Sequence, residues 1–349
     1  MKTKIFTINN QNTDRDALRE AGEILHRGGL VAFPTETVYG LGGDALNRES
    51  SRKIYAAKGR PSDNPLIVHI CRIEDMDTLA REVTPAAKAV AEAFWPGPLT
   101  LILPKSDLVP YETTGGLDTV AIRLPSHPVA RELIDYAGGY VAAPSANLSG
   151  KPSPTIAKYV IQDMDGRVDA IIDGGEVGIG LESTIIDMTV QPPQILRPGY
   201  VTRQMLEQVL GQVDVDATIL SNDSGQAPKA PGMKYRHYAP RGEMCIVAGD
   251  PKQVSAYINE QIGLDVSRGE RVGVICTDET ADAYEAAVVK TAGSRQDEES
   301  IARHLYTILR EFDDEQVTRI YSEDFAPEGL GQAIMNRLLK AAGHRRIEL

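Results

Sequence analysis

Residues 221–242 interrupt the hydrophobic pattern of the chain and divide it into two parts with different patterns. This stretch contains Ser, Asn, Gly and Pro and shows little apolar periodicity, a composition typical of a connection between domains. The chain has 349 residues, which is enough for two domains. We therefore predict a first domain over residues 1–212, a linker over residues 213–242 and a second domain over residues 243–349.

The second part alternates regularly between short apolar runs and amphipathic stretches. Strands are predicted at Cys245–Ala248, Arg271–Cys276, Ala286–Lys290 and Arg319–Tyr321, and helices at 251–262, near 280–287, at 298–312 and at 331–342. This order is typical of a small, parallel, Rossmann-like α/β domain. Because no G-x-G-x-x-G follows its first strand, the sequence does not mark a dinucleotide site.

The first part mixes helices and strands without a regular βαβ repeat. Helices are predicted at 14–27, 50–57, 84–95, 127–137 and 202–210, and strands at 30–33, 66–70, 99–103, 119–124, 140–143, 170–173, 183–188 and 195–196. The irregular order favours a twisted, partly antiparallel sheet with helices around it over a doubly wound sheet.

Two polar strings at the ends of predicted strands carry the main chemical signal. In the first, Lys58 and Arg60 are separated by one glycine, and in an extended segment they would point the same way. Both cations would then complement phosphate oxygens, whereas the alternative is two solvated surface charges. In the second string, Ser145 and Asn147 offer hydroxyl and amide groups. The chain has no Walker motif, so these strings are not part of a P-loop.

Two polar residues lie inside otherwise apolar strands. Arg123 needs a partner if it is buried, and the partner is either an acidic residue of a neighbouring strand or the carboxylate of a ligand. His69, taken alone, is better explained as a satisfied core residue than as a ligand contact. The segment Pro34–Leu41 follows the first predicted strand, where Thr35 or Thr37 caps a helix start, the polar side chains present ligand groups, or both hold together, because a helix N-terminus also attracts anions.

The overall composition excludes several classes of function. The net charge of −12 disfavours broad nucleic-acid binding. Three scattered cysteines favour a reducing, cytoplasmic location, and the six histidines show no metal-binding spacing, so no metal site is predicted. The N-terminus lacks a signal-peptide core, and no run approaches the ~20 apolar residues of a membrane span. We therefore expect a soluble protein with no membrane partner.

Taken in order, these strings resemble the YrdC-type threonylcarbamoyl-AMP synthases in their long, two-domain form. The matching segments are Pro34–Gly42, Lys58–Leu66, Trp95–Thr100, Val120–Pro125, Pro144–Pro152, Glu182–Thr184 and Leu196–Gly199. The K-x-R and S-x-N signature of the family stands here as Lys58, Arg60, Ser145 and Asn147. Pro231–Pro240 is similar to the linker of the long form, so the resemblance covers essentially the whole chain.

The resemblance implies a nucleotidyltransferase that makes threonylcarbamoyl-AMP and pyrophosphate from L-threonine, bicarbonate and ATP, with Mg²⁺ sharing the charge stabilisation. The implied catalytic residues are Lys58 and Arg60. The implied ATP contacts are Arg60, Asn64, Thr119, Ser145, Asn147, Ser153, Arg197, Tyr235 and Arg236. The implied threonine contacts are Thr37, His69, Arg123, Ala143 and Ser183. The linker would close over the site and exclude water.

The resemblance also implies a partner and leaves two rival functions. The product would pass to a separate tRNA threonylcarbamoyl transferase, a transient partner, for modification beside the anticodon, and direct tRNA binding by this chain would be weak or indirect. An RNA-binding module of the same fold is disfavoured because the sequence carries no basic stripe. A carbamoyl-transfer enzyme of the hydrogenase-maturation type is disfavoured because the chain lacks zinc-type cysteine pairs.

Overall fold

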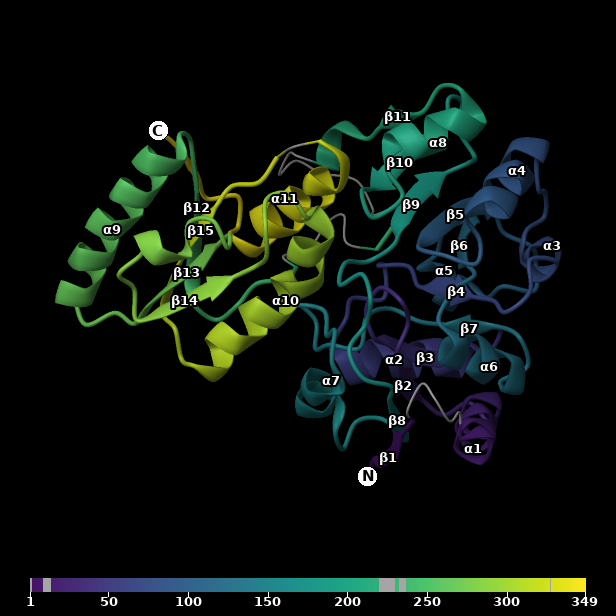
Figure 1. Cartoon of the computed structure of the whole chain (residues 1–349). Helices are drawn as coiled ribbons and strands as arrows, with labels where there is room; N and C mark the ends of the chain where they lie inside the picture. Colours follow the sequence, from purple (N-terminus) through teal and green to yellow (C-terminus); the bar gives the residue numbers. More distant parts are fainter. Residues whose placement is uncertain (1, 9–13, 220–229, 232–236, 327) are drawn as a thin grey trace. The chain divides into compact units, whose positions relative to one another are not determined.

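The computed structural model describes residues 2–8, 14–219, 230, 231, 237–326 and 328–349. The chain packs as two compact units, which Figure 1 shows in sequence colours. One unit comprises Met1–Ser149, Ser153–Gly178 and Glu182–Lys234, and the other comprises Gly150–Pro152, Ile179–Leu181 and Tyr235–Leu349. Two short segments from the first part of the sequence thus belong to the second unit. The domain boundaries that we predicted stay a prediction.

The first unit is built on a mixed sheet with the strand order β1-β8-β2-β3-β7-β4-β6-β5-β9-β10-β11. Its strands are β1 (Lys4–Thr7), β2 (Val31–Phe33), β3 (Gly40–Asp44), β4 (Ile67–His69), β5 (Leu99–Pro104), β6 (Thr119–Arg123), β7 (Val141–Ala142), β8 (Ala170–Asp173), β9 (Thr184–Asp187), β10 (Gln194–Arg197) and β11 (Asp214–Val215). β4 runs parallel to β6, and β5 runs antiparallel to it. The partly antiparallel sheet is therefore confirmed.

Helices cover this sheet, and their ends follow local chemistry. They are α1 (Arg15–His26), α2 (Arg48–Lys58), α3 (Asp75–Leu79), α4 (Pro85–Phe94), α5 (Tyr111–Thr114), α6 (Pro128–Tyr136), α7 (Ala157–Met164), α8 (Arg203–Leu210) and the 3₁₀ turn η1 (Ala217–Ile219). The carboxylate of Asp14 accepts a hydrogen bond from the backbone N–H of Ala17 and caps α1. Gly59 ends α2 in the left-handed conformation with φ of 62°, so Lys58 is the last helical residue.

The segment after β2 differs from one of our two predictions. No helix begins at Thr35, because the described chain turns at residues 36–38 and enters β3 at Gly40. The hydroxyl of Thr35 donates to the carbonyl of Val38 at 2.6 Å and so closes this turn. The turn places Glu36 at the end of a buried strand rather than on a helix surface.

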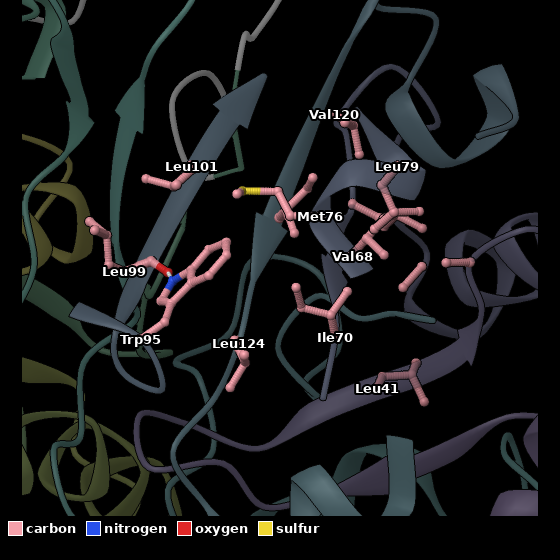
Figure 2. Close-up of a cluster of buried hydrophobic side chains, with 14 of the residues drawn as sticks. Leu41, Val68, Ile70, Met76, Leu79, Trp95, Leu99, Leu101, Val120 and Leu124 are labelled. Carbon is pink, nitrogen blue, oxygen red and sulfur yellow. Dashed lines mark hydrogen bonds between the residues drawn. The ribbon is translucent and has the colours of Figure 1, made fainter. Parts of the chain in front are cut away.

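One face of the sheet carries the main hydrophobic core, which Figure 2 shows in close-up. Val68, Val120 and Leu101 point into this core from β4, β6 and β5. The indole N–H of Trp95 donates to the carbonyl of Leu99 at 2.7 Å, which satisfies the polar atom of a buried aromatic side chain. Because side chains alternate along a strand, the intervening residues of these three strands point to the opposite face.

The second unit is a parallel sheet with the order β14-β13-β15-β12-β16. Its elements are β12 (Glu243–Ala248), α9 (Pro251–Ser267), β13 (Val272–Cys276), η2 (Ala281–Ala283), β14 (Val288–Thr291), α10 (Glu298–Asp314), β15 (Arg319–Glu323), α11 (Gly329–Ala341) and β16 (Arg346–Glu348). The parallel, Rossmann-like architecture is confirmed.

Two local predictions in this unit are wrong or incomplete. The helix predicted near 280–287 is only the short turn η2, because the β-branched pair Val288 and Val289 is used in β14 beside β13. The final strand β16 was not predicted, since three residues leave no periodic pattern. Every described helix of the two units is too short or too polar to span a lipid bilayer.

Candidate functional site

Polar side chains form a row across the face of the first unit's sheet that lies opposite the main core. His69 and Arg123 occupy paired positions on the neighbouring strands β4 and β6, and Thr100 of β5 pairs with Arg123 on its other side. Paired residues of adjacent strands point to the same face. All three are nearly inaccessible to solvent, with His69 and Arg123 each 4 % exposed. Buried polar groups require hydrogen-bond partners, which must come from neighbouring residues or from a ligand.

Ser183 and Arg197 extend this row. The hydroxyl of Ser183, one residue before β9, lies 2.8 Å from the hydroxyl of Thr100. Arg197, the last residue of β10, donates from Nη2 to the Ser183 hydroxyl at 3.1 Å and from Nε to the Ser183 carbonyl at 3.0 Å. Its Nη1 donates to the carbonyl of Pro231 at 3.3 Å. The predicted threonine contact Ser183 and the predicted nucleotide contact Arg197 are therefore in direct contact.

Arg123 faces an acidic side chain from the turn after β2. Its Nη2 lies 2.8 Å from Oε1 of Glu36, which is close enough for an ion pair. The directional geometry is poor, however, because Nε and Nη2 of Arg123 and both carboxylate oxygens of Glu36 lack hydrogen-bond partners in the described part of the chain. All four atoms are shielded from solvent. Buried atoms of this kind are normally satisfied, so the pair has unused hydrogen-bonding capacity that a ligand could take up.

For the two hydroxyl groups beside Glu36, those of Thr35 and Thr37, the hydrogen-bond donor and acceptor can be assigned. The Thr35 hydroxyl donates to the Val38 carbonyl, and it lies 2.9 Å from the Thr37 hydroxyl. A hydroxyl has one proton, so Thr37 must be the donor of this second bond. The free lone pairs of Thr37 then remain as acceptors for an N–H or O–H of a ligand. Ala143, the other predicted threonine contact near this end of the sheet, is fixed by its N–H, which donates to the Ile67 carbonyl at 2.9 Å.

His69 is held neutral by its surroundings. Burial, with a contribution from the positive charge of Arg123, lowers the pKa of His69 from 6.5 to about 3, and its Nδ1 lies 3.1 Å from the Ile67 carbonyl. The unfolded chain binds a proton near pH 6.5 that the folded chain does not bind. Stability contributed by the neutral ring is thus fully present above pH 6.5 and is lost as the pH falls toward 3.

When the pH is lowered from 8 to 5, His69 becomes protonated in the unfolded chain but not in the folded protein. We expect this difference alone to lower the free energy of unfolding by about 2 kcal/mol. The measurement is urea denaturation of the wild type and of His69→Gln at both pH values. The variant removes the titrating ring, so its pH-dependent loss should be smaller by that amount. Equal losses in the two proteins would show that His69 is not held neutral.

Lys58 joins the two polar strings directly. Lys58 is buried, with 2 % of the residue exposed. Its ammonium donates to the carbonyl oxygens of Ser145 and Asn147 and lies 3.4 Å from Oδ1 of Asn147. The Ser145 hydroxyl donates to the same Oδ1. The extended geometry that we predicted for Lys58 and Arg60 is wrong, because Lys58 ends a helix and Gly59 reverses the chain. The helix end directs Lys58 into the second string.

Arg60 and Asn64 form a second local arrangement in the first string. Arg60 donates from Nε to the carbonyl of Asn64 at 3.2 Å and from Nη2 to the carbonyl of Pro65 at 3.0 Å. Its side chain thus shapes the loop that it belongs to. Asn64 is buried at 1 % exposure, and its side-chain Oδ1 has no hydrogen-bond donor among the residues described. An unsatisfied buried acceptor fits a ligand hydroxyl or amino group.

The other predicted nucleotide contacts are spread over three places. Thr119 begins β6 and lies on the same face as Arg123 by strand alternation. Ser153 is buried, and its hydroxyl donates to Oε1 of Glu182 at 2.6 Å. Tyr235 and Arg236, which belong to the predicted lid, lie outside the described residues.

Sequence reasoning omitted Glu36, Thr100 and His127 from the site. Glu36 stood in a segment that we had noted, but its role depends on a contact with a residue 87 positions away in β6. His127 has a buried Nδ1 without a partner in the described chain, and burial lowers its pKa while the charge of Glu36 opposes this shift. Thr100 ends one of the segments that match the family, but a threonine in a strand is ordinary and does not by itself indicate a site.

Comparisons with known proteins cover both parts of the chain. Residues 23–199 match the family model described as Telomere recombination, which includes Sua5, YciO and YrdC, and residues 201–343 match the model described as Threonylcarbamoyl-AMP synthase, C-terminal domain. A threonylcarbamoyl-AMP synthase from Bacillus subtilis (strain 168) is 48% identical over 99% of this chain and 100% of its own length. One from Schizosaccharomyces pombe is 36% identical over 94% of this chain and 88% of its own length. The crystal structure of Pyrococcus abyssi Sua5 complexed with L-threonine superimposes with a TM-score of 0.94 at 45% identity, covering 99% and 100% of the two chains.

Proposed function

Because this chain belongs to the threonylcarbamoyl-AMP synthase family, we propose that it makes threonylcarbamoyl-AMP and pyrophosphate from L-threonine, bicarbonate and ATP. Enzymes of this family are nucleotidyltransferases, and that class applies to this chain. The observation that carries the choice of substrate is the buried guanidinium of Arg123, whose Nε and Nη2 have no hydrogen-bond acceptor in the described structure. These two atoms form the edge that binds a carboxylate in bidentate fashion.

The residues around Arg123 suit a small amino acid. The neutral ring of His69 and the side chain of Thr100 flank Arg123 on the two neighbouring strands, and the Ser183 hydroxyl lies against Thr100. The Thr37 hydroxyl, next to Glu36, and the backbone at Ala143, fixed on the Ile67 carbonyl, are also uncharged. L-threonine is the ligand of the similar structure from Pyrococcus abyssi. We assign these residues as threonine contacts, with Arg123 on the carboxylate.

The nucleotide would lie beside the two polar strings. In the proposed reaction, the threonine amine attacks bicarbonate to give an N-carboxylate and water. That carboxylate attacks the α-phosphorus of ATP in line and expels pyrophosphate. Lys58 and Arg60 would stabilise the charge that moves to the leaving group, since preorganised cations act most strongly in a water-poor site. Asn64, Thr119, Ser145, Asn147, Ser153 and Arg197, with Tyr235 and Arg236 from the linker, would hold the nucleotide.

Mg²⁺ enters this proposal as part of the MgATP substrate. Within the described residues, no group of three or more His, Cys, Asp or Glu side chains could hold a metal ion. Phosphate oxygens and water would therefore supply most ligands of the ion, which is usual for Mg²⁺ bound with ATP. The product would be transferred to tRNA by a separate enzyme.

Pyrophosphate release tests the proposed function. The protein is supplied with MgATP, bicarbonate and each of the common amino acids in turn, and pyrophosphate is measured with a coupled assay. We expect release with L-threonine and at least tenfold less with the other amino acids, because a site built to bind a substrate hydroxyl rejects analogues that lack it. Strong, salt-dependent RNA binding without amino-acid-dependent turnover would favour the RNA-binding alternative instead.

A further inference from the structure

The contact between Glu36 and Arg123 is an unusual buried ion pair. Its two charged groups approach to 2.8 Å, yet neither directs a hydrogen bond to the other. The side chains are 12 % and 4 % exposed, so solvent does not replace the missing bonds. Ion pairs with incomplete hydrogen bonding do not recover the cost of removing both charges from water. The pair is thus poorly explained as a contribution to stability.

The charges of Glu36 and Arg123 indicate what kind of ligand would bind both groups. A simple anion would pair with Arg123 but would be repelled by Glu36, and a simple cation would meet the opposite difficulty. A ligand that carries both charges a few ångströms apart would satisfy both groups. Free α-amino acids have this property at neutral pH, because the carboxylate and the ammonium are attached to the same carbon.

Glu36 is the acidic group available to bind the ammonium, because the side chains of the neighbouring row carry no negative charge. His69 is neutral and donates from Nδ1 to a backbone carbonyl. Thr37 has acceptor lone pairs but no charge. In the row of His69, Arg123, Thr100, Ser183 and Arg197, the described side chains carry positive charge or none. Glu36 is therefore the anion placed beside the carboxylate-binding arginine.

We propose that Glu36 binds the ammonium group of the substrate amino acid while Arg123 binds its carboxylate, an inference that rests on the proposed function. One oxygen of Glu36 keeps its contact with Nη2 of Arg123, and the other oxygen accepts from the ammonium. The two residues together recognise a free amino acid rather than a carboxylic acid or an amine. Glu36 is thus a substrate-binding residue that the sequence signature did not include.

The test compares three ligands that differ in one group. They are L-threonine, L-2-aminobutanoate, which lacks the hydroxyl, and (2S,3R)-2,3-dihydroxybutanoate, in which a hydroxyl replaces the amine. Affinities are measured by isothermal titration calorimetry on the full chain with saturating α,β-methylene-ATP, which cannot release pyrophosphate. The variants are Glu36→Gln, which removes the charge at constant size, and Glu112→Gln as a matched control. Glu112 also pairs with an arginine, Arg52 at 2.9 Å, but on the surface.

We expect Glu36→Gln to weaken binding of both amine-containing ligands by about ten- to a hundredfold, the usual range for a lost hydrogen bond to a charged group. Binding of the dihydroxy acid should be unchanged or tighter, because removing the carboxylate relieves repulsion. The control variant should bind all three ligands like the wild type. This pattern is a double-mutant cycle between Glu36 and the ligand amine.

Three outcomes would overturn the inference. If Glu36→Gln weakens all three ligands equally, Glu36 serves only to hold Arg123. If L-threonine binding is unchanged, Glu36 does not contact the amine. If the wild type binds none of the ligands, the proposed function fails as well, which separates that result from the first two. Thermal denaturation checks the fold, and if Glu36→Gln does not fold, Glu36→Asp gives the same comparison because a shorter acid should weaken the amine-containing ligands selectively.

Discussion

Arg123→Gln is expected to reduce the kcat/KM for L-threonine by on the order of a thousandfold, with little change in ATP binding. Removing one partner of a buried, hydrogen-bonded charge pair at a binding site costs about 2–5 kcal/mol, and Arg123 is the buried cation that would meet the substrate carboxylate. Glutamine keeps two donors but loses the charge and the bidentate edge. Steady-state pyrophosphate release gives kcat/KM, and nucleotide titration gives the ATP affinity.

This variant also has a stability effect that a second substitution should reverse. With Arg123 removed, Glu36 is left buried without its 2.8 Å cation, a change that typically costs about 3–5 kcal/mol. The double variant Arg123→Gln with Glu36→Gln removes both charges and should recover most of that stability while remaining inactive. If Arg123→Gln alone were as stable as the wild type and fully active, neither the ion pair nor the carboxylate assignment would stand.

Lys58→Ala is expected to lower pyrophosphate release by at least about a hundredfold and to destabilise the protein as well. The activity loss reflects a cation removed from the proposed phosphate site, where one preorganised group contributes 10²–10³ in rate. The stability loss arises because the carbonyls of Ser145 and Asn147 lose the ammonium that they accept from. Leaving buried acceptors unsatisfied costs about 1–3 kcal/mol each.

Lys88→Ala serves as the control for this experiment, because Lys88 is exposed on α4. That change should leave both turnover and the urea midpoint within error of the wild type. A Lys58→Ala protein with normal turnover would reject the phosphate assignment. If the protein instead loses only stability and regains full turnover when folded at low temperature, Lys58 is a loop support without a role in charge stabilisation.

Lys58 and Arg60 contact different parts of the site. The sequence predicts that they lie on an extended loop and point the same way. In the structure the left-handed Gly59 separates them, so that Lys58 holds the second string and Arg60 closes its own loop onto Asn64 and Pro65. The two polar strings are in direct contact through Lys58, which binds the carbonyls of Ser145 and Asn147. We did not predict this contact from the sequence.

Features that depend on local patterning could be predicted from the amino-acid sequence. Alternating apolar runs predicted the mixed sheet and the parallel second unit, and the helices predicted at 14–27 and 84–95 begin after the caps Asp14 and Thr84. The ordered polar strings pointed to the family, because their sequence and spacing are visible without any fold.

The assembly of the site depends on contacts between distant segments, which the sequence does not reveal. His69, Arg123 and Thr100 become one row because strand register places them side by side, and register is set by the packing of the opposite face into the core. Glu36 joins Arg123 through a turn whose direction no local rule predicted. Contacts between residues far apart in the chain depend on the whole packed sheet, so the partner of a buried charge cannot be read from its sequence neighbours.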